Sequence, residues 1–192
     1  MYKYPIIVFE GIETSGKSTN LLKVSNFLKK IKRNFIKIRE PGGSMHSEII
    51  RKIILNKYKL NFKTDLLLLM AARSENYEKI LKKNNGKKII LIDRFIDSTI
   101  AYQHYGFGIN LALIKTINKH LIKNFKIDYT FLNIVNKKNM IKRLKKRKSL
   151  NRYDQFDINF YNKVQKGFLK LAKLNKKSYK IIDSNLDIKK NE

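Results

Sequence analysis

The chain has 192 residues, 43% of them hydrophobic, which is enough for one packed domain and short for two. It carries 43 Lys and Arg against 15 Asp and Glu, a formal charge of +28, and no cysteine, so a disulfide framework and a thiolate metal site are excluded. The longest apolar run, 66–72, is far below the roughly 20 residues that span a bilayer, and the first residues lack a signal-peptide pattern. We therefore expect a cytoplasmic protein with no membrane partner.

The positive charge favours anionic partners, but its distribution argues against a specific nucleic-acid interface. Lysine outnumbers arginine and is scattered through every segment, without one basic stripe interleaved with aromatic residues. Asn, Ile, Tyr and Phe are also abundant, which is typical of an A+T-biased coding sequence. A small polyanionic substrate is equally favoured by this charge.

The first predicted elements are an apolar strand at 5–9 and a helix whose apolar residues recur from Leu21 to Ile31. Between them lies the pattern G-x-x-x-x-G-K-[ST], which is typical of a phosphate-binding loop because its backbone N–H groups and the following helix dipole attract anions. In this chain the pattern predicts that Lys17 reaches the outer phosphates and that Ser18 is a Mg²⁺ ligand. The predicted ATP-binding residues are Gly11, Ile12, Glu13, Thr14, Ser15, Gly16, Lys17, Ser18 and Thr19.

The rest of the chain alternates between helical and strand patterns. Further strands are predicted at 34–39, 88–92, 129–134 and 179–183. Helices are predicted at 47–56, 64–83 with Thr64 as N-cap, 97–104, 111–124, 137–148 and 157–174, with a polar loop at 149–154.

Five apolar strands separated by helices predict an α/β fold with a parallel sheet covered by helices on both faces, in one domain over 1–192. Ligands bind outside the carboxyl ends of such strands, so the phosphate loop, residues 39–43 and Asp93-Arg94 should share one rim. Asp93 suits a Mg²⁺ partner there, although a helix N-cap would require the same residue type.

These motifs together resemble thymidylate kinase. The resemblance rests on EGIETSGKST at 10–19, REPGG at 39–43, AAR at 71–73, DRFIDSTIAYQ at 93–103 and NRYD at 151–154. It implies a P-loop three-layer fold with a mobile lid at about 143–155, and phosphoryl transfer from MgATP to dTMP, giving dTDP and ADP for dTTP synthesis. Mg²⁺, held by Ser18 and Asp93, is the implied cofactor, and a homodimer through the apolar helix faces of 47–83 is implied as well.

The resemblance also implies roles for residues of the acceptor site. Glu13 is expected to bind the sugar, and Tyr102 to disfavour ribonucleotides. Arg94 is expected to clamp the phosphates and Arg73 to read the base or the phosphate. The implied substrate-binding set is Glu13, Pro41 (in a cis bond), Leu69, Arg73, Arg94, Ser98, Thr99, Tyr102 and Gln103. Leu69 occupies a position where the family usually has an aromatic ring, which leaves two alternatives: weaker affinity for the base, or compensation by Phe95 or Tyr77.

The catalytic set implied in this way is Lys17, Arg94, Arg152 and Arg147. The loop positions that hold an arginine in some family members are Thr14 and Ser15 here, so the chain resembles the members in which a mobile lid supplies the charge. We expect Arg152 to act as the arginine finger with support from Arg147, and the residues Lys142, Arg143, Lys145 and Lys146 to form a solvated face.

Other functions stay open at this point. Another nucleoside monophosphate kinase or a deoxynucleoside kinase would keep the loop and the Asp-Arg pair, and a basic nucleic-acid-dependent ATPase would keep the loop. His46, His104 and His120 lie at no metal-ligand spacing and are expected to be structural or exposed. The terminal helix that is usual in the family is not expected, because the chain ends at Glu192.

Overall fold

The structure is a computed structural model that describes residues 4–56, 60–123 and 125–186. In this part of the chain, five parallel strands form one sheet in the order β2-β3-β1-β4-β5. The strands are β1 (Ile6–Glu10), β2 (Phe35–Arg39), β3 (Ile89–Asp93), β4 (Tyr129–Ile134) and β5 (Tyr179–Asp183). The predicted fold class is confirmed.

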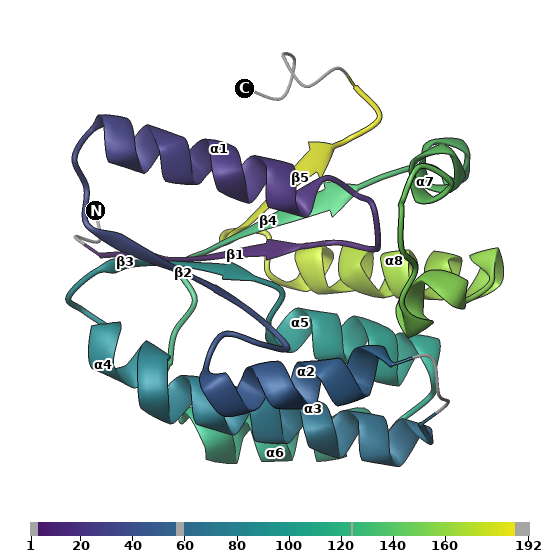
Figure 1. Cartoon of the computed structure of the whole chain (residues 1–192), viewed down its shortest axis with the longest axis horizontal. Helices are drawn as coiled ribbons and strands as arrows, with labels where there is room; N and C mark the ends of the chain where they lie inside the picture. The colour runs from purple at the N-terminus through teal and green to yellow at the C-terminus, as the bar shows by residue number, and fades with distance from the viewer. Residues whose placement is uncertain (1–3, 57–59, 124, 187–192) are drawn as a thin grey trace.

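Helices lie on both faces of the sheet (Figure 1). On one face lies α1 (Lys17–Lys30), whose Leu28 packs with Phe9 and Leu91. The opposite face is covered by α2 (Met45–Leu55), α3 (Phe62–Asn76), α4 (Lys82–Asn84), α5 (Ile96–Thr99), α6 (Leu111–Ile122) and α8 (Ile158–Leu174). The short α7 (Lys137–Leu144) lies beside the loop that precedes α1, where Arg143 Nη1 donates to the Thr14 carbonyl over 3.1 Å.

The central strands β1 and β3 are apolar up to their last residues, Glu10 and Asp93, because both faces of the sheet are covered. Ile90, Leu91 and Ile92 of β3 are completely buried, and they alternate between the core under α1 and the core on the opposite face. This buried register brings the ends of β1, β2 and β3 to one rim, where Phe9 pairs with Asp93 and Asp93 pairs with Arg39.

Several predicted helices differ from the observed ones at their ends. The helix predicted from Thr64 begins at Phe62 because the Asn61 side chain accepts a hydrogen bond from Thr64 N over 2.9 Å and so caps it. It continues into a π-helical segment, Tyr77–Leu81, and then into α4. Likewise α5 continues as a π-helical segment, Ile100–Gly106, so the helix predicted at 97–104 spans 96–106 in the structure.

The segment after α7 also departs from its prediction. The helix predicted to reach residue 148 ends at Leu144, and the loop predicted at 149–154 contains a short helical turn, Arg152–Gln155, which we call the lid turn. Asn151 caps that turn by accepting from Tyr153 N over 2.8 Å. The predicted helix end at residue 124 and the chain end at 187–192 lie outside the described residues.

Candidate active site

A cavity of about 900 Å³ opens at the carboxyl ends of the strands. It is lined by the phosphate loop, the end of β2, helices α2 and α3, the segment 93–103 and the lid. This volume lies within the range of ligand pockets for small molecules and cofactors. The rim predicted from the sequence therefore coincides with a real pocket.

The phosphate loop owes its shape to glycine. Gly11 has a φ of +138°, and a Cβ at this position would lie 2.3 Å from the Asn133 carbonyl oxygen. Gly16 adopts a left-handed conformation as the N-cap of α1. The amides of this turn thus reach the cavity at the positive end of the helix dipole.

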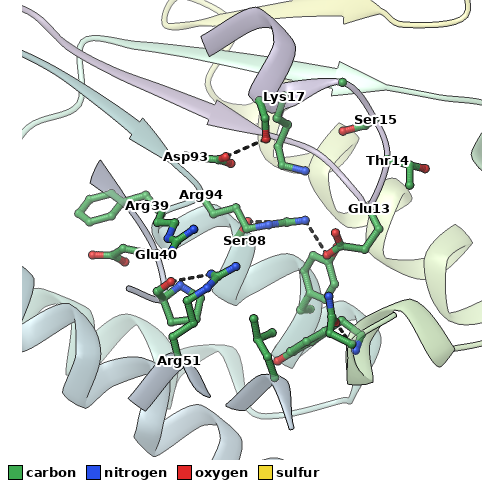
Figure 2. Close-up of a pocket in the computed structure, with 18 of the residues that line it drawn as sticks. Glu13, Thr14, Ser15, Lys17, Arg39, Glu40, Arg51, Asp93, Arg94 and Ser98 are labelled. Carbon is green, nitrogen blue, oxygen red and sulfur yellow. Dashed lines mark hydrogen bonds and ion pairs between the residues drawn. The ribbon is translucent and has the colours of Figure 1, made fainter. Parts of the chain in front are cut away.

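Lys17 lies on the floor of the loop, where its Nζ donates to the Ile12 carbonyl over 2.8 Å. Burial lowers the pKa of Lys17 to about 8, although Glu13 and Asp93 oppose the shift. Figure 2 shows Lys17, Arg39, Arg51 and Arg94 around one opening. A cluster of cations at a helix N-terminus fits a polyanion.

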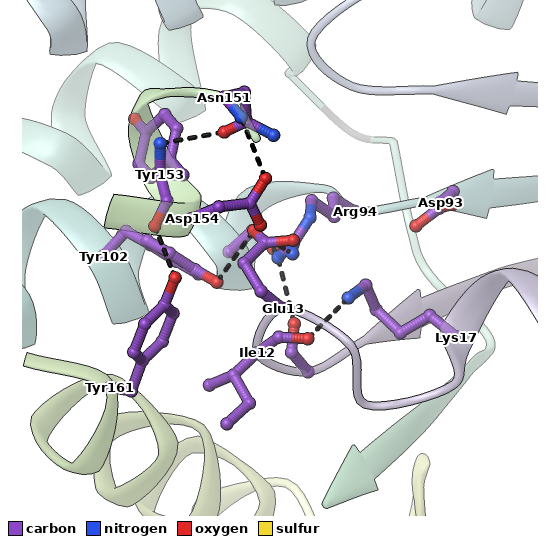
Figure 3. A network of polar contacts seen from close by, with 12 residues as sticks. Ile12, Glu13, Lys17, Asp93, Arg94, Tyr102, Asn151, Tyr153, Asp154 and Tyr161 are labelled. Carbon is purple, nitrogen blue, oxygen red and sulfur yellow. Dashed lines mark hydrogen bonds and ion pairs between the residues drawn. The ribbon is translucent and has the colours of Figure 1, made fainter. Parts of the chain in front are cut away.

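Glu13 and Arg94 form an ion pair across the cavity. Arg94 Nη2 donates to Glu13 Oε1 over 2.7 Å, and Tyr102 Oη donates to the same oxygen over 3.3 Å (Figure 3). Burial would raise the pKa of Glu13, but the charges of Arg94, Lys17 and Arg147 outweigh it and lower the pKa to about 2. The carboxylate therefore stays ionised and accepts hydrogen bonds at neutral pH.

Arg94 is also held by the backbone around it. Its φ is +66°, its amide donates to the Phe9 carbonyl over 3.0 Å, and its Nη1 donates to the Gly11 carbonyl over 2.9 Å. Burial opposes its charge, yet Glu13 raises the pKa of Arg94 above its ordinary value. The guanidinium is thus fixed beside the phosphate loop.

Arg73 lies at the opposite end of the cavity and is only 2% exposed. It donates to Glu40 Oε2 over 2.8 Å, to Asn118 Oδ1 over 2.7 Å and to Thr99 Oγ1 over 3.0 Å. Burial raises the pKa of Glu40, an effect that Arg73 opposes. The Glu40–Pro41 bond is cis, as expected. These contacts hold Arg73 against the cavity wall.

Ser18 and Asp93 meet at the phosphate loop. Ser18 Oγ donates to Asp93 Oδ2 over 3.1 Å, so a hydroxyl and a carboxylate oxygen are adjacent. Oxygen ligands of this kind suit Mg²⁺, so the two residues fit the predicted metal role. Asp93 lies three residues before Ile96, the first residue of α5, and the N-cap of that helix is Phe95, so the alternative role of Asp93 as an N-cap is wrong.

Three arginines of the lining had no assigned role in the sequence analysis, which placed Arg39 only on the predicted rim; the solvated face expected for Arg143 is wrong, because Arg143 packs on the phosphate loop. Arg39 and Arg51 lie near Pro41, whose carbonyl accepts from Arg51 Nη1 over 2.7 Å, and Arg143 of α7 lies beside the phosphate loop. Arg51 lies in the helix predicted to follow the REPGG turn, and its contact with the Pro41 carbonyl is what brings it to the cavity. For Arg143, only the packing of α7 on the loop reveals the contact.

The lid places its two predicted arginines differently. Arg147 lines the cavity, is 36% exposed and lies 3.8 Å from Glu13 Oε2. Arg152 lies outside the cavity lining, is 6% exposed and pairs with Asp65 of α3. In this arrangement Arg147 reaches the site and Arg152 does not.

All the other predicted acceptor residues line the cavity, namely Pro41, Leu69, Ser98, Thr99, Tyr102 and Gln103. Phe95 lines it as well, whereas Tyr77 packs in the core against Phe125. Of the two aromatic residues considered as substitutes at Leu69, only Phe95 is therefore at the cavity.

Among the residues that the structure describes, neither a cluster of metal ligands nor a membrane-spanning helix is found. No three or more His, Asp or Glu side chains there are grouped as a metal site would require. No helix in the same ranges is both long and apolar enough to cross a membrane.

A parallel sheet of this order, a phosphate loop and a rim of arginines define a P-loop nucleotide kinase. The sequence model of the family described as Thymidylate kinase matches residues 9–192. The chain belongs to the thymidylate kinase family.

Individual relatives agree with this assignment. A thymidylate kinase of Sulfurihydrogenibium sp. is 39% identical over 185 residues, which cover 95% of this chain and 90% of that protein. The thymidylate kinase of Wolbachia pipientis is 41% identical over 169 residues, covering 86% and 84%. The crystal structure of thymidylate kinase from Ehrlichia chaffeensis matches with a TM-score of 0.78 and 35% identity, covering 93% of this chain and 92% of that one.

Proposed function

We propose that the cavity transfers the terminal phosphoryl group of MgATP to dTMP, giving dTDP and ADP. The family assignment supports the reaction. The single observation that carries the site assignment is Arg94, which contacts the phosphate loop at Gly11 and Glu13 and also lines the rest of the cavity. A group in this position is in reach of two phosphates at once.

The donor half is the phosphate loop. Backbone amides of residues 13–18 cradle the ATP phosphates, Lys17 neutralises the outer ones, and Thr14, Ser15 and Thr19 complete the turn. Arg143 and Arg147 border the same half from α7 and the lid. Ser18 and Asp93 would hold Mg²⁺, which supplies charge neutralisation to the phosphates when bound.

The acceptor half is lined by residues of α2, α3 and the segment 93–103. Arg51 and Arg94 bind the acceptor phosphate, since guanidinium groups match phosphate oxygens bidentately. Glu13 and Tyr102 take the sugar. The residues of the base end are Pro41, Leu69, Arg73, Phe95, Ser98, Thr99 and Gln103.

The chemistry requires no general base. The nucleophile is an ionised oxygen of the acceptor phosphate, which attacks the terminal phosphorus of ATP as the bond to the ADP oxygen breaks. Lys17, Arg94 and Arg147 stabilise the negative charge of the transferring group, and the protein contributes position and electrostatics. Closure of the lid over ATP excludes water from the reaction.

A coupled ADP-release assay with MgATP tests this assignment. We expect a marked preference for dTMP over dUMP, UMP, CMP, GMP and AMP, without any requirement for DNA. Turnover with a different nucleotide would assign the chain to another nucleoside monophosphate kinase. Turnover only with DNA present would make it a nucleic-acid-dependent ATPase.

The proposed assembly is a homodimer, and the proposed location is the cytoplasm, where ATP and nucleotides are available. Met45, Ile49 and Ile53 follow one another at four-residue spacing on α2 and are 73%, 53% and 46% exposed, and Leu67 of α3 is 61% exposed. Burial of these side chains in a partner would stabilise a dimer. Sedimentation of the chain and of its Ile49→Glu variant tests this, with a dimer and a monomer as the expected results.

A further inference from the structure

Asp65 of α3 is a buried carboxylate that joins the lid to the acceptor half of the cavity. It is 0% exposed and is approached by side chains from two other parts of the chain. Arg152 Nη2 pairs with its Oδ1, while Tyr153 Oη and Gln103 Nε2 donate to its Oδ2 over 2.6 and 3.1 Å. A carboxylate this deeply buried is stable only when it is paired and hydrogen-bonded, so these contacts are mutually dependent.

On the lid side, the turn that Asp65 fixes carries the partner of Arg147. Asp154 pairs with Arg147 through Oδ1 and accepts from Asn151 N through Oδ2 over 3.0 Å. Figure 3 shows Tyr153 and Asp154 of this turn and its cap Asn151, close to Glu13 and Arg94. The Tyr161 hydroxyl donates to the Tyr153 carbonyl, which fastens the turn to α8. The position of Arg147 therefore depends on where the lid turn is held.

On the acceptor side, Asp65 fixes Gln103. Gln103 Nε2 donates to both Asp65 and the Tyr153 hydroxyl, the latter over 3.3 Å. Its Oε1 is buried and has no hydrogen-bond partner, and Gln103 lines the cavity. An acceptor atom of this kind calls for a donor on a ligand, because an unsatisfied buried polar atom is costly. A ligand that binds in the acceptor half would therefore contact Gln103, a side chain that Asp65 already holds in place.

We propose that Asp65 is a positioning residue: it anchors the lid turn through Arg152 and Tyr153, and so places Arg147 over the transferring phosphoryl group. Its bond to Gln103 ties this placement to occupation of the acceptor half. The inference rests on the proposed function, and it makes Arg152 the residue that holds the lid turn to Asp65. It also accounts for the burial of Arg152 away from the cavity.

The test is a double-mutant cycle with the full-length chain. Asp65→Asn keeps the shape of the side chain but leaves Arg152 without a counter-charge. We expect it to lower kcat about 10- to 100-fold, with a smaller change in KM for ATP. Because the effect passes through Arg147, Asp65→Asn added to Arg147→Ala should lower kcat less than about twofold further. Effects on kcat that multiply in the double variant would overturn the inference.

A purely structural role would lower the melting temperature without this coupling, so thermal melting is measured on each variant. Asp157→Asn is the matched control, because Asp157 caps α8 just after the lid turn by accepting from Phe160 N over 2.7 Å, and asparagine caps equally well. It should leave kcat unchanged. If the parent chain fails to phosphorylate dTMP, the proposed function fails; an active parent with multiplicative effects rejects only the role of Asp65.

A second variant decides the matter if Asp65→Asn does not fold. Tyr153→Phe removes one hydrogen bond to Asp65 and leaves the ion pair with Arg152 in place. The chain has no cysteine, so Leu150→Cys in the exposed lid gives a unique site for a fluorescent label. We expect Tyr153→Phe to lower the anisotropy of the label and to lower kcat only when Arg147 is present. Unchanged anisotropy and kcat would overturn the proposal.

Discussion

The Arg94 guanidinium and the Glu13 carboxylate bridge two strand ends of the sheet. Arg94 follows β3, Glu13 lies in the loop after β1, and their side chains meet at 2.7 Å. The pair is 17% and 14% exposed, so a ligand entering the cavity reaches both groups. Each charge maintains the other: the pKa of Arg94 is raised and that of Glu13 is lowered to about 2.

Removal of Arg94 should abolish most of the activity. Arg94→Ala deletes the cation that, in the proposed function, contacts both phosphates, and we expect kcat to fall about a hundredfold or more, as for the loss of one transition-state donor. The coupled ADP-release assay at saturating ATP and dTMP measures it. Arg94→Lys keeps a point charge without the planar fork and should recover only part of the rate. An alanine variant within twofold of the parent would contradict the assignment.

Lys17 should give the enzyme an alkaline limit. Burial lowers its pKa to about 8, so the free enzyme loses the phosphate-binding charge as the pH rises through that value. We therefore expect kcat/KM for ATP to decline above about pH 8, since this parameter reports the free enzyme. The alkaline decline of kcat itself should occur at a higher pH than that of kcat/KM, because bound phosphates favour the charged Lys17 amine. A flat kcat/KM up to about pH 10 would speak against this role.

Glu10 should make folding stability depend on pH. It is fully buried and accepts from Phe95 N over 2.9 Å and from Ser98 N and Oγ over 3.1 and 2.5 Å. Burial, together with the charge of Asp97, raises the pKa of Glu10 from 4.5 to about 7. The folded state holds this proton more tightly than the unfolded state, so the stability it contributes is complete below pH 4.5 and is lost as the pH rises through 7.

The comparison that checks this is urea unfolding of the parent and of Glu10→Gln across that range. The variant stays neutral at that position and does not lose this stability. Its free energy of unfolding, relative to that of the parent, should therefore rise by about 2 to 3 kcal/mol from below about pH 4.5 to about pH 8. A difference between the two proteins that does not vary with pH would show that Glu10 does not titrate in this way.

Leu69 should limit affinity for the base. It lines the cavity where the family usually has an aromatic ring, and it offers apolar contact without ring stacking. Leu69→Phe should lower KM for dTMP about two- to tenfold, which corresponds to the free energy of one stacked aromatic pair. It should leave KM for ATP unchanged. Steady-state kinetics decide this. Leu169→Phe on α8, 38% exposed and outside the cavity lining, is the control and should change neither KM.

The two lid arginines should differ in what their loss affects. Arg147→Ala removes a partly exposed cation at the cavity, so kcat should fall at least about tenfold. It also leaves Asp154 without its counter-charge, but that carboxylate keeps its hydrogen bond from Asn151 N, so the melting temperature should fall less than on loss of Arg152. Arg152→Ala leaves the buried Asp65 without its counter-charge and should cost about 3 kcal/mol of stability. Kinetics and thermal unfolding of both variants separate the roles. Equal melting temperatures for the two would contradict the anchoring of Arg152.

The sequence by itself determined the fold and the donor half of the site. Short, mainly apolar stretches bounded by turn residues predicted β4 and β5 with the observed bounds. The run of Ile89 to Ile92 predicted β3 within one residue, because a strand buried on both faces leaves an unbroken apolar signal. The spacing from Gly11 to Ser18 predicted the phosphate loop, since only glycine tolerates the close approach at Gly11. The rule that ligands bind at the strand ends then brought Asp93 and Arg94 to the cavity.

Only the tertiary structure decided which charged side chains face the cavity and which are buried beneath it. Arg147 and Arg152 are close in sequence, yet one lines the cavity and the other pairs with Asp65, 87 residues earlier in the chain. The buried carboxylates Glu10 and Asp65 resemble any other acidic residue in the sequence. The physical reason is that a side chain's charge and length are local properties, whereas its counter-charge and its burial come from elements that are distant in the chain.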